Sequence, residues 1–199
     1  MSLLDLFRPQ WKHSRPAVRA AAVRGINNSD LLAEIARTDS DRDVRIAAVR
    51  MLTSQKVLVS IARSDGNDGV RKAAVEKLKD QSLLAEVAKS NASPSVRSHA
   101  VERLTDQSAL VEVARNDLNE GVRALAAGKL INEAQAQAVY ADLARSASAA
   151  SARQSAVWKL SDRALLAEIA KADSDPEVRR AAELRLGFLG RGPEANPTR

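Results

Sequence analysis

The fold is decided by residues 31–52, LLAEIARTDSDRDVRIAAVRML, because this stretch holds two motifs that recur along most of the chain. One motif is a Val-Arg dipeptide, which returns every 26 residues except for one interval of 30. Its copies begin at Val18, Val44, Val70, Val96, Val122, Ala152 and Val178, with Ala replacing Val in the sixth. The LLAEIAR motif keeps the same spacing, in residues 31–37, 57–63, 83–89, 109–115, 139–145 and 165–171. Two motifs that recur together at a fixed period indicate a repeat architecture.

Each motif has the apolar spacing of an amphipathic helix. The Val-Arg motif places apolar residues at offsets 0, 4, 5 and 8, as in Val44, Ala48, Val49 and Leu52, which is one stripe of a 3.6-residue period. We name its helix the A helix, and the helix of the LLAEIAR motif the B helix. Residues that favour N-caps precede both: Asp41, Asn67, Ser93, Asn119 and Asp175 for the A helices, and Asn28, Ser54, Asp80, Asp106 and Asp162 for the B helices.

A helix pair this short cannot bury its own apolar face, so stacking of successive pairs must supply the core. We therefore predict an all-α fold, a right-handed α-solenoid of stacked short helix pairs. Residues 1–14 would form an N-terminal cap through Leu3, Leu4, Leu6, Phe7 and Trp11. Residues 15–187 would form the array, six helix pairs plus a final helix, and residues 188–199 a flexible tail. The interval of 30 adds four residues in 131–140, which predicts a B helix lengthened by one turn at its start.

Composition narrows the function classes. There is no cysteine, which excludes disulfides, thiolate metal sites and cysteine nucleophiles, and is compatible with the cytoplasmic location that we predict. No apolar run reaches the roughly 18 residues of a membrane span. No glycine-rich phosphate loop, Ser-His-Asp set or carboxylate pair is present, so we predict no catalytic residue, no metal and no cofactor.

With these motifs in view, the chain resembles the HEAT-like repeat superfamily over roughly residues 15–187, including its short bacterial forms. It is also similar to leucine-rich-variant and phycobilisome-lyase-type repeats. The marker is an Asp six residues before the Arg: Asp39 and Arg45, Asp65 and Arg71, Asp117 and Arg123, and Asp173 and Arg179. The resemblance implies that these residues form a buried ladder between successive repeats, and that B helices line a concave surface.

The leading functional hypothesis is a noncatalytic scaffold that binds another protein. A basic column follows the B helices: Arg37, Arg63, Lys89, Arg115, Arg145 and Lys171. An acidic residue stands three positions before most of them, as Glu34 does before Arg37, so this face has mixed charge. Tyr140 and Trp158 lie where the repeat is irregular, which makes them candidate anchors for a partner.

The alternative hypothesis is a nucleic-acid- or ribosome-associated protein. It would use the basic N-terminal segment and a basic column on the A helices: Arg8, Lys12, Arg15, Lys77, Arg103, Lys129, Lys159 and Arg185. Aromatic residues that could stack on bases are not interleaved with these cations. A small-molecule substrate is not implied by any motif.

Overall fold

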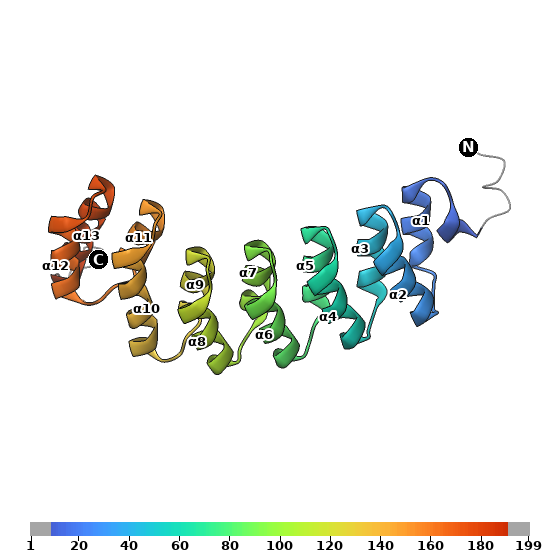
Figure 1. Cartoon of the computed structure of the whole chain (residues 1–199), viewed down its shortest axis with the longest axis horizontal. Helices are drawn as coiled ribbons and strands as arrows, with labels where there is room; N and C mark the ends of the chain where they lie inside the picture. Colours follow the sequence, from blue (N-terminus) through green and yellow to red (C-terminus); the bar gives the residue numbers. More distant parts are fainter. Residues whose placement is uncertain (1–8, 191–199) are drawn as a thin grey trace, which may run out of the picture. The chain divides into compact units, whose positions relative to one another are not determined.

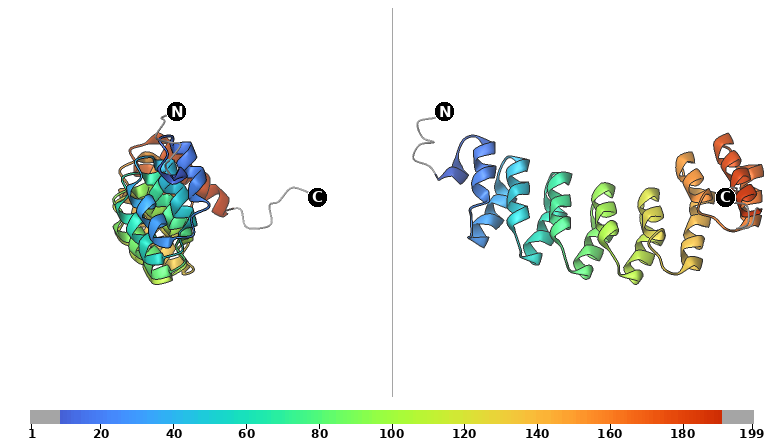
Figure 2. Two further views of the ribbon diagram at one scale, coloured as in Figure 1. Left: turned by 90° about the vertical axis from the view of Figure 1, so that its right-hand side faces the viewer. Right: turned by 180° about the vertical axis from the view of Figure 1, so that it is seen from behind.

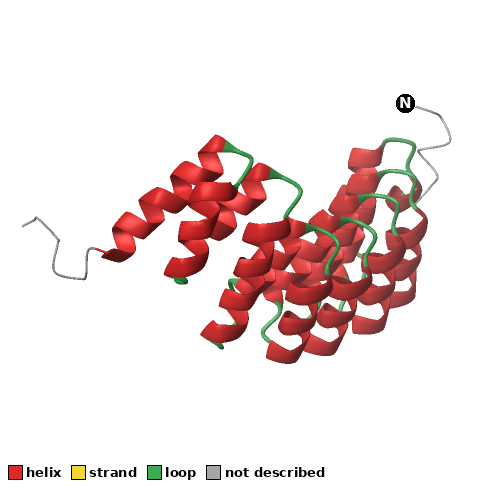
Figure 3. Cartoon of the chain, turned by 60° about the vertical axis from the view of Figure 1, so that its left-hand side comes forward, coloured by secondary structure: helices red, strands yellow, loops and turns green. Residues whose placement is uncertain are grey.

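The structure is a computed structural model that describes residues 9–190 of the chain. Within that range it contains thirteen α-helices, one 3-10 helix and no strand (Figure 3). The A helices are α1 (Pro16–Val23), α3 (Arg42–Met51), α5 (Asp68–Lys77), α7 (Pro94–Arg103), α9 (Glu120–Ala127), α11 (Ala150–Val157) and α13 (Pro176–Gly190). The B helices are α2 (Ser29–Thr38), α4 (Gln55–Ser64), α6 (Gln81–Ser90), α8 (Gln107–Asn116), α10 (Glu133–Ser146) and α12 (Arg163–Ala172), and the 3-10 helix is η2 (Gln10–Lys12). The all-α prediction is confirmed.

One part of the predicted organisation differs in the structure, and another lies outside the residues that the structure describes. Helix α13 continues to Gly190, so residues 188–190 belong to the last helix and not to a tail. Leu3, Leu4, Leu6 and Phe7 of the predicted cap, and the tail from residue 191, lie outside the described residues.

The helices divide into two compact units, Met1–Asp106 and Gln107–Arg199. In both units each B helix packs most extensively on the A helix that follows it, as α2 does on α3 and α12 on α13 (Figure 1). The close pair therefore begins with the B helix, and the array is a first helix, α1, followed by six pairs. Successive pairs stack within each unit, so the predicted solenoid of helix pairs is confirmed. Figure 2 shows the helices of the pairs from two further sides.

The A helices provide most of the contact between neighbouring pairs. Within each unit, successive A helices mostly pack closely, whereas successive B helices touch at few positions. An alanine at the fourth position after Val makes this approach possible, because a larger side chain would hold the backbones apart. Ala48, Ala74 and Ala100 are fully buried in the first unit, and Ala126 and Ala182 in the second.

The four-residue insertion lengthens one helix as predicted. Helix α10 has 14 residues where α8 and α12 have 10, and the side chain of Asn132 caps its new start. Val139 and Leu143 of α10 remain buried. A whole extra turn keeps the apolar stripe on the same side, so the core is undisturbed.

Most predicted caps are formed. The side chains of Asp41, Asn67 and Asn119 accept hydrogen bonds from the first backbone N–H groups of α3, α5 and α9. Ser93 is an exception: it makes no side-chain cap to α7, and its hydroxyl donates to the carboxylate of Asp68 in the preceding pair.

Candidate functional site

The arginine of the Val-Arg motif links neighbouring pairs. Nε and Nη2 of Arg45 donate to the two carboxylate oxygens of Asp65, at 2.9 and 3.0 Å, twenty residues further along the chain. Nη1 of Arg45 donates to the backbone carbonyl of Asp39, six residues earlier, at 2.9 Å. The contact implied by the resemblance therefore differs in its partner: Arg45 pairs with the Asp of the next pair and not with the side chain of the Asp six residues earlier. The Asp six residues earlier contributes its backbone.

The same arrangement recurs at Arg19 with Asp39, and at Arg153 with Asp173. Burial on its own raises the pKa of Asp39, but hydrogen bonds from Arg19 and from the backbone N–H of Asp41 outweigh it and hold that pKa below its ordinary value. The hydrogen bond from Arg153 likewise lowers the pKa of Asp173. These carboxylates are ionised and paired, which is a structural role.

Two arginines have no Asp at the ladder position of the next pair, and each has an acid three residues earlier on its own helix. Asn91 stands twenty residues after Arg71, and Arg71 forms an ion pair with Asp68, three residues earlier. Asn91 is buried and donates to the backbone carbonyl of Ala62 at 2.7 Å. Nε of Arg71 is buried without a hydrogen-bond partner in the described residues.

The second case is Arg123, where the inserted turn moves the ladder position to Ala147. Nη1 of Arg123 lies 3.6 Å from the carboxylate of Asp142 on α10 instead. Glu120, three residues before Arg123, accepts hydrogen bonds from the backbone N–H groups of Ser148 and Ala149. These backbone bonds, the one from Ser148 foremost, lower the pKa of Glu120. In the loop of Asp39, Oδ1 of Asp39 accepts a hydrogen bond from the backbone N–H of Asp41. Glu120 makes the equivalent contact with the backbone of the loop that contains Ala147.

A glutamine ladder was missed by the sequence analysis. Gln81, at the start of α6, donates to the carbonyl of Arg103 and accepts from the backbone N–H of Thr105 in the next turn between an A and a B helix. Three other glutamines make the same two contacts at the same repeat position: Gln55, Gln107 and Gln137. Their spacing of 26, 26 and 30 residues was the signal in the sequence.

The basic column on the A helices is partly used within the fold. Nζ of Lys77 donates to the carbonyl of Arg50 at 2.9 Å, and Arg103 and Arg185 donate to the carbonyls of Leu78 and Leu160. These carbonyls lie at the C-terminal ends of the preceding A helices, where a cation is favoured. Lys129 is half-buried and Lys159 is exposed. The structure thus gives Lys77, Arg103 and Arg185 a role in stacking.

The B-helix column is exposed along its length, at Arg37, Arg63, Lys89, Arg115, Arg145 and Lys171. Arg63 forms an ion pair with Glu86 of the next B helix rather than with a residue of its own helix. Exposed pairs of this kind contribute about 0.2–1 kcal/mol. The column is thus a solvated face with charges of both signs.

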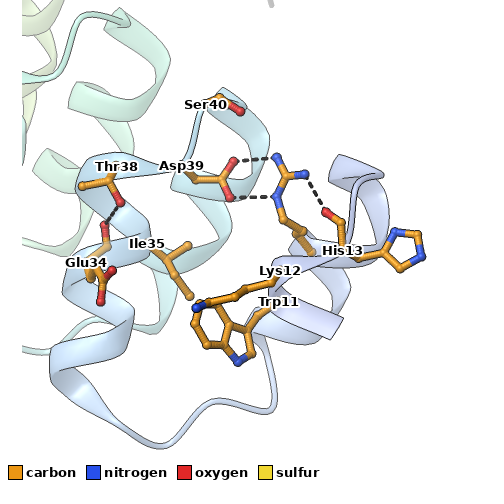
Figure 4. Close-up of a pocket in the computed structure, with 9 residues that line it drawn as sticks. Trp11, Lys12, His13, Glu34, Ile35, Thr38, Asp39 and Ser40 are labelled. Carbon is orange, nitrogen blue, oxygen red and sulfur yellow. Dashed lines mark hydrogen bonds and ion pairs between the residues drawn. The ribbon is translucent and has the colours of Figure 1, made fainter. Parts of the chain in front are cut away.

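The N-terminal end holds a depression of about 520 Å³, lined by Trp11, Lys12, His13, Glu34, Ile35, Thr38, Asp39 and Ser40 together with Arg19 (Figure 4). Lys12 lies over the ring of Trp11, 4.6 Å from its centroid. Both carboxylate oxygens of Asp39 accept hydrogen bonds from Arg19, and the hydroxyl of Thr38 donates to the carbonyl of Glu34. The guanidinium of Arg19, the carboxylate of Asp39 and the hydroxyl of Thr38 are thus already engaged within the fold. Arg15 is exposed, and Arg8 lies outside the described residues.

Tyr140 lies in the core. Only 7% of it is exposed, burial raises the pKa of its hydroxyl, and a Cβ added at Gly128 would lie 3.3 Å from that oxygen. Because the missing side chain at Gly128 leaves room for the ring, Tyr140 fills the space beside the lengthened helix. This burial removes Tyr140 from any surface that a partner could contact.

Trp158 behaves differently, since it belongs to an exposed apolar cluster. Trp158 at the end of α11 is 37% exposed, and Leu184 and Phe188 on α13 are 47% and 55% exposed. The rings of Trp158 and Phe188 lie 6.0 Å apart, and Leu184 is one helical turn from Phe188. We call these three residues the Trp158 cluster.

The repeat shows that this cluster is unusual. Trp158 and Leu184 occupy the same repeat position, six residues after the Val of the motif. The same position carries a charged, exposed residue in each of the first four repeats: Arg24, Arg50, Glu76 and Glu102. Packing of the pairs therefore does not require an apolar side chain there.

The described residues offer little for metal binding or membrane insertion. His99 lies 3.2 Å from Glu102 and 3.6 Å from Glu76, but no group of three His, Asp or Glu side chains that could hold a metal occurs within residues 9–190. In the same range no helix has both the length and the apolar character needed to cross a bilayer.

Comparison with family models, with curated proteins and with solved structures gives no match to this chain.

Proposed function

We propose that this protein is a noncatalytic scaffold of HEAT-like type that binds another protein through the Trp158 cluster. The observation that carries the proposal is the change of one repeat position from charged in the first four repeats to Trp158 and Leu184 in the last two. Exposed aromatic and aliphatic side chains that the fold does not need are the usual anchors of protein interfaces.

The regular columns support this choice because they are accounted for by stacking. The arginines pair with aspartates, the glutamines bond the neighbouring turns, and part of the A-helix cations cap neighbouring helices. The B-helix cations are exposed and, with the acidic residues beside them, would form a mixed-charge rim near a contact. Nucleic-acid binding has less support, since Lys77, Arg103 and Arg185 bond backbone carbonyls.

The test uses the immobilised full chain to retain partners, followed by measurement of the dissociation constant of each purified partner. Phe188→Ser and Leu184→Ser should weaken binding by at least about ten-fold, or about 1.4 kcal/mol. The matched control is Ile131→Ser, because Ile131 is also an exposed aliphatic residue of the second unit, at 85%.

Partners that bind the Leu184→Ser and Phe188→Ser chains as well as the parent chain would contradict the proposal. A titration with DNA and RNA at about 50 mM salt separates the alternative, because phosphate contacts weaken steeply as salt rises. Binding with that salt dependence, unchanged by Phe188→Ser, would favour the nucleic-acid function.

A further inference from the structure

The arginine ladder provides an internal template for a contact between helix pairs. In Arg19, Arg45 and Arg153, Nη1 bonds two backbone carbonyls of the loop before the helix. Nε and Nη2 of each bond both oxygens of an Asp in the loop of the next pair, at 2.8 to 3.0 Å.

Arg179 on α13 has the first half of this template. Its Nη1 donates to the carbonyls of Asp173 and Ser174, at 2.7 and 3.1 Å. These bonds orient the guanidinium as in Arg45. No carboxylate within residues 9–190 forms an ion pair with it, and the residue is only half-buried.

The residue three positions before Arg179 groups it with the arginines that bond an Asp at the ladder position of the next loop. Where the ladder position of the next pair has no Asp, an acid stands three residues before the Arg, as Asp68 does before Arg71 and Glu120 before Arg123. Pro176 stands three residues before Arg179, as Pro16 does before Arg19. The helix of Arg179 therefore supplies no substitute at that position.

The surface around Arg179 also repeats one that accepts a helix pair within this chain. Residues 165–186 and 31–52 are identical at 14 of 22 positions, namely LLAEIA, DSD, Val-Arg, Ala-Ala and the final Leu. On α2 and α3, which contain residues 31–51, the pair α4–α5 packs and Asp65 reaches Arg45.

We propose that the outer face of α12 and α13 docks a helix pair of another protein, whose loop between helices carries an aspartate that completes the ladder at Arg179. The charges support an acidic occupant. Arg153 is ion-paired with Asp173, whereas Arg179, the next arginine of the series, has no ion pair within residues 9–190. The proposal uses a different surface from the Trp158 cluster and does not rest on it.

A second copy of this chain fits the face less well. The residue six positions before the first ladder arginine, where Asp39 and Asp65 stand in later repeats, is His13. The first loop of a second copy would therefore present a histidine to Arg179, and the two-oxygen contact could not form.

The probe for the test is a peptide of residues 55–104 of this chain, which contains α4–α7 and Asp65 and has no Trp or Tyr. Once circular dichroism has shown that the probe is helical, it is labelled with a dye at its N-terminus and titrated with the full chain, and fluorescence anisotropy reports binding. We expect saturable binding that is at least about ten-fold weaker, or about 1.4 kcal/mol, with Arg179→Gln in the chain or with Asp65→Asn in the probe.

A double-mutant cycle then tests whether the two groups contact each other. Arg179→Gln in the chain combined with Asp65→Asn in the probe should weaken binding no more than either change alone. Arg180→Gln, a neighbouring exposed arginine, is the control and should leave the dissociation constant within about two-fold.

Several results would overturn the proposal. No binding of the probe, or equal affinity of the parent probe and the probe with Asp65→Asn, removes the ladder contact. Affinity raised by Glu194→Gln would show that the chain's own terminal segment occupies Arg179. A chain that dimerises in sedimentation, and loses the dimer with Arg179→Gln, would make a second copy the occupant.

Discussion

Arg45 of α3 shares its guanidinium between two loops, with the backbone carbonyl of Asp39 on one side and the carboxylate of Asp65 on the other. One side chain therefore fixes its own loop and holds the next pair in place. The bond to Asp65 buries both charges, with 14% of the Arg45 side chain and 6% of the Asp65 side chain exposed. Charged groups at this depth stabilise only when both members are present.

Asp65→Asn should lower the free energy of unfolding by about 1–3 kcal/mol, because the amide leaves part of the Arg45 guanidinium unpaired. Urea denaturation monitored by circular dichroism measures it. Asp43→Asn makes the same chemical change at a side chain that is 74% exposed and should cost less than about 0.5 kcal/mol. Equal losses for the two variants would show that the ladder contributes no special stability.

Glu120→Gln should destabilise the second unit by about 1 kcal/mol, since a neutral amide oxygen accepts more weakly from the N–H of Ser148. Adding Ala147→Asp to that variant should recover stability, because it restores the carboxylate that Arg153 and Arg19 find in their neighbouring loops. The measurement is the urea midpoint of the single and double variants, with Glu168→Gln, an exposed change, as the control. A double variant less stable than Glu120→Gln would show that Glu120 does not replace the missing ladder Asp at position 147.

Gln137→Ala should lower the unfolding free energy by about 0.5–1.5 kcal/mol, because the amide bonds both the carbonyl of Lys159 and the backbone N–H of Ser161. Gln135→Ala on the same helix is the matched control, since the structure gives its side chain no hydrogen bond. Thermal unfolding of the two variants measures the difference. Indistinguishable melting temperatures would mean that the hydrogen bonds of Gln137 contribute no more to stability than hydrogen bonds to water.

The chain should lose stability on acidification. The pKa values of Asp39 and Asp173 lie below their ordinary value of 3.8 in the folded protein. The unfolded chain therefore binds more protons, and the free energy of unfolding falls as pH drops from about 5 through the folded pKa values. Urea titrations at pH 7, 4 and 3 measure this slope. Asp173→Asn should reduce it, and an unchanged slope would show that this pair does not contribute.

A larger side chain at the alanine column should disturb the packing between A helices. Ala74→Leu is expected to cost about 1–3 kcal/mol through overpacking at a fully buried position. Ala20 lies on an A helix but is only half-buried, so Ala20→Leu is the milder comparison. An unchanged melting temperature for Ala74→Leu would mean that the A helices do not approach as closely as the structure shows.

The candidate site was predicted only in part. Trp158 is exposed as an anchor requires, whereas Tyr140 is buried, although both were chosen for the same irregularity of the repeat. The difference depends on Gly128, whose missing side chain admits the ring of Tyr140, and this neighbour lies twelve residues away, just past the end of another helix. Leu184 and Phe188 were not predicted as anchors, because their exposure depends on how α13 packs on α11.

The sequence by itself determined the helices, their caps and their stacking period, because these depend on local spacing and on motifs that recur at 26 residues. It also determined that the inserted turn would leave the core in register. Only the tertiary structure decided which groups meet: that Arg45 reaches forward to Asp65, that a B helix pairs with the following A helix, and that Lys77 caps a neighbour. These contacts depend on the separation and rotation of stacked pairs, and a one-dimensional pattern contains neither.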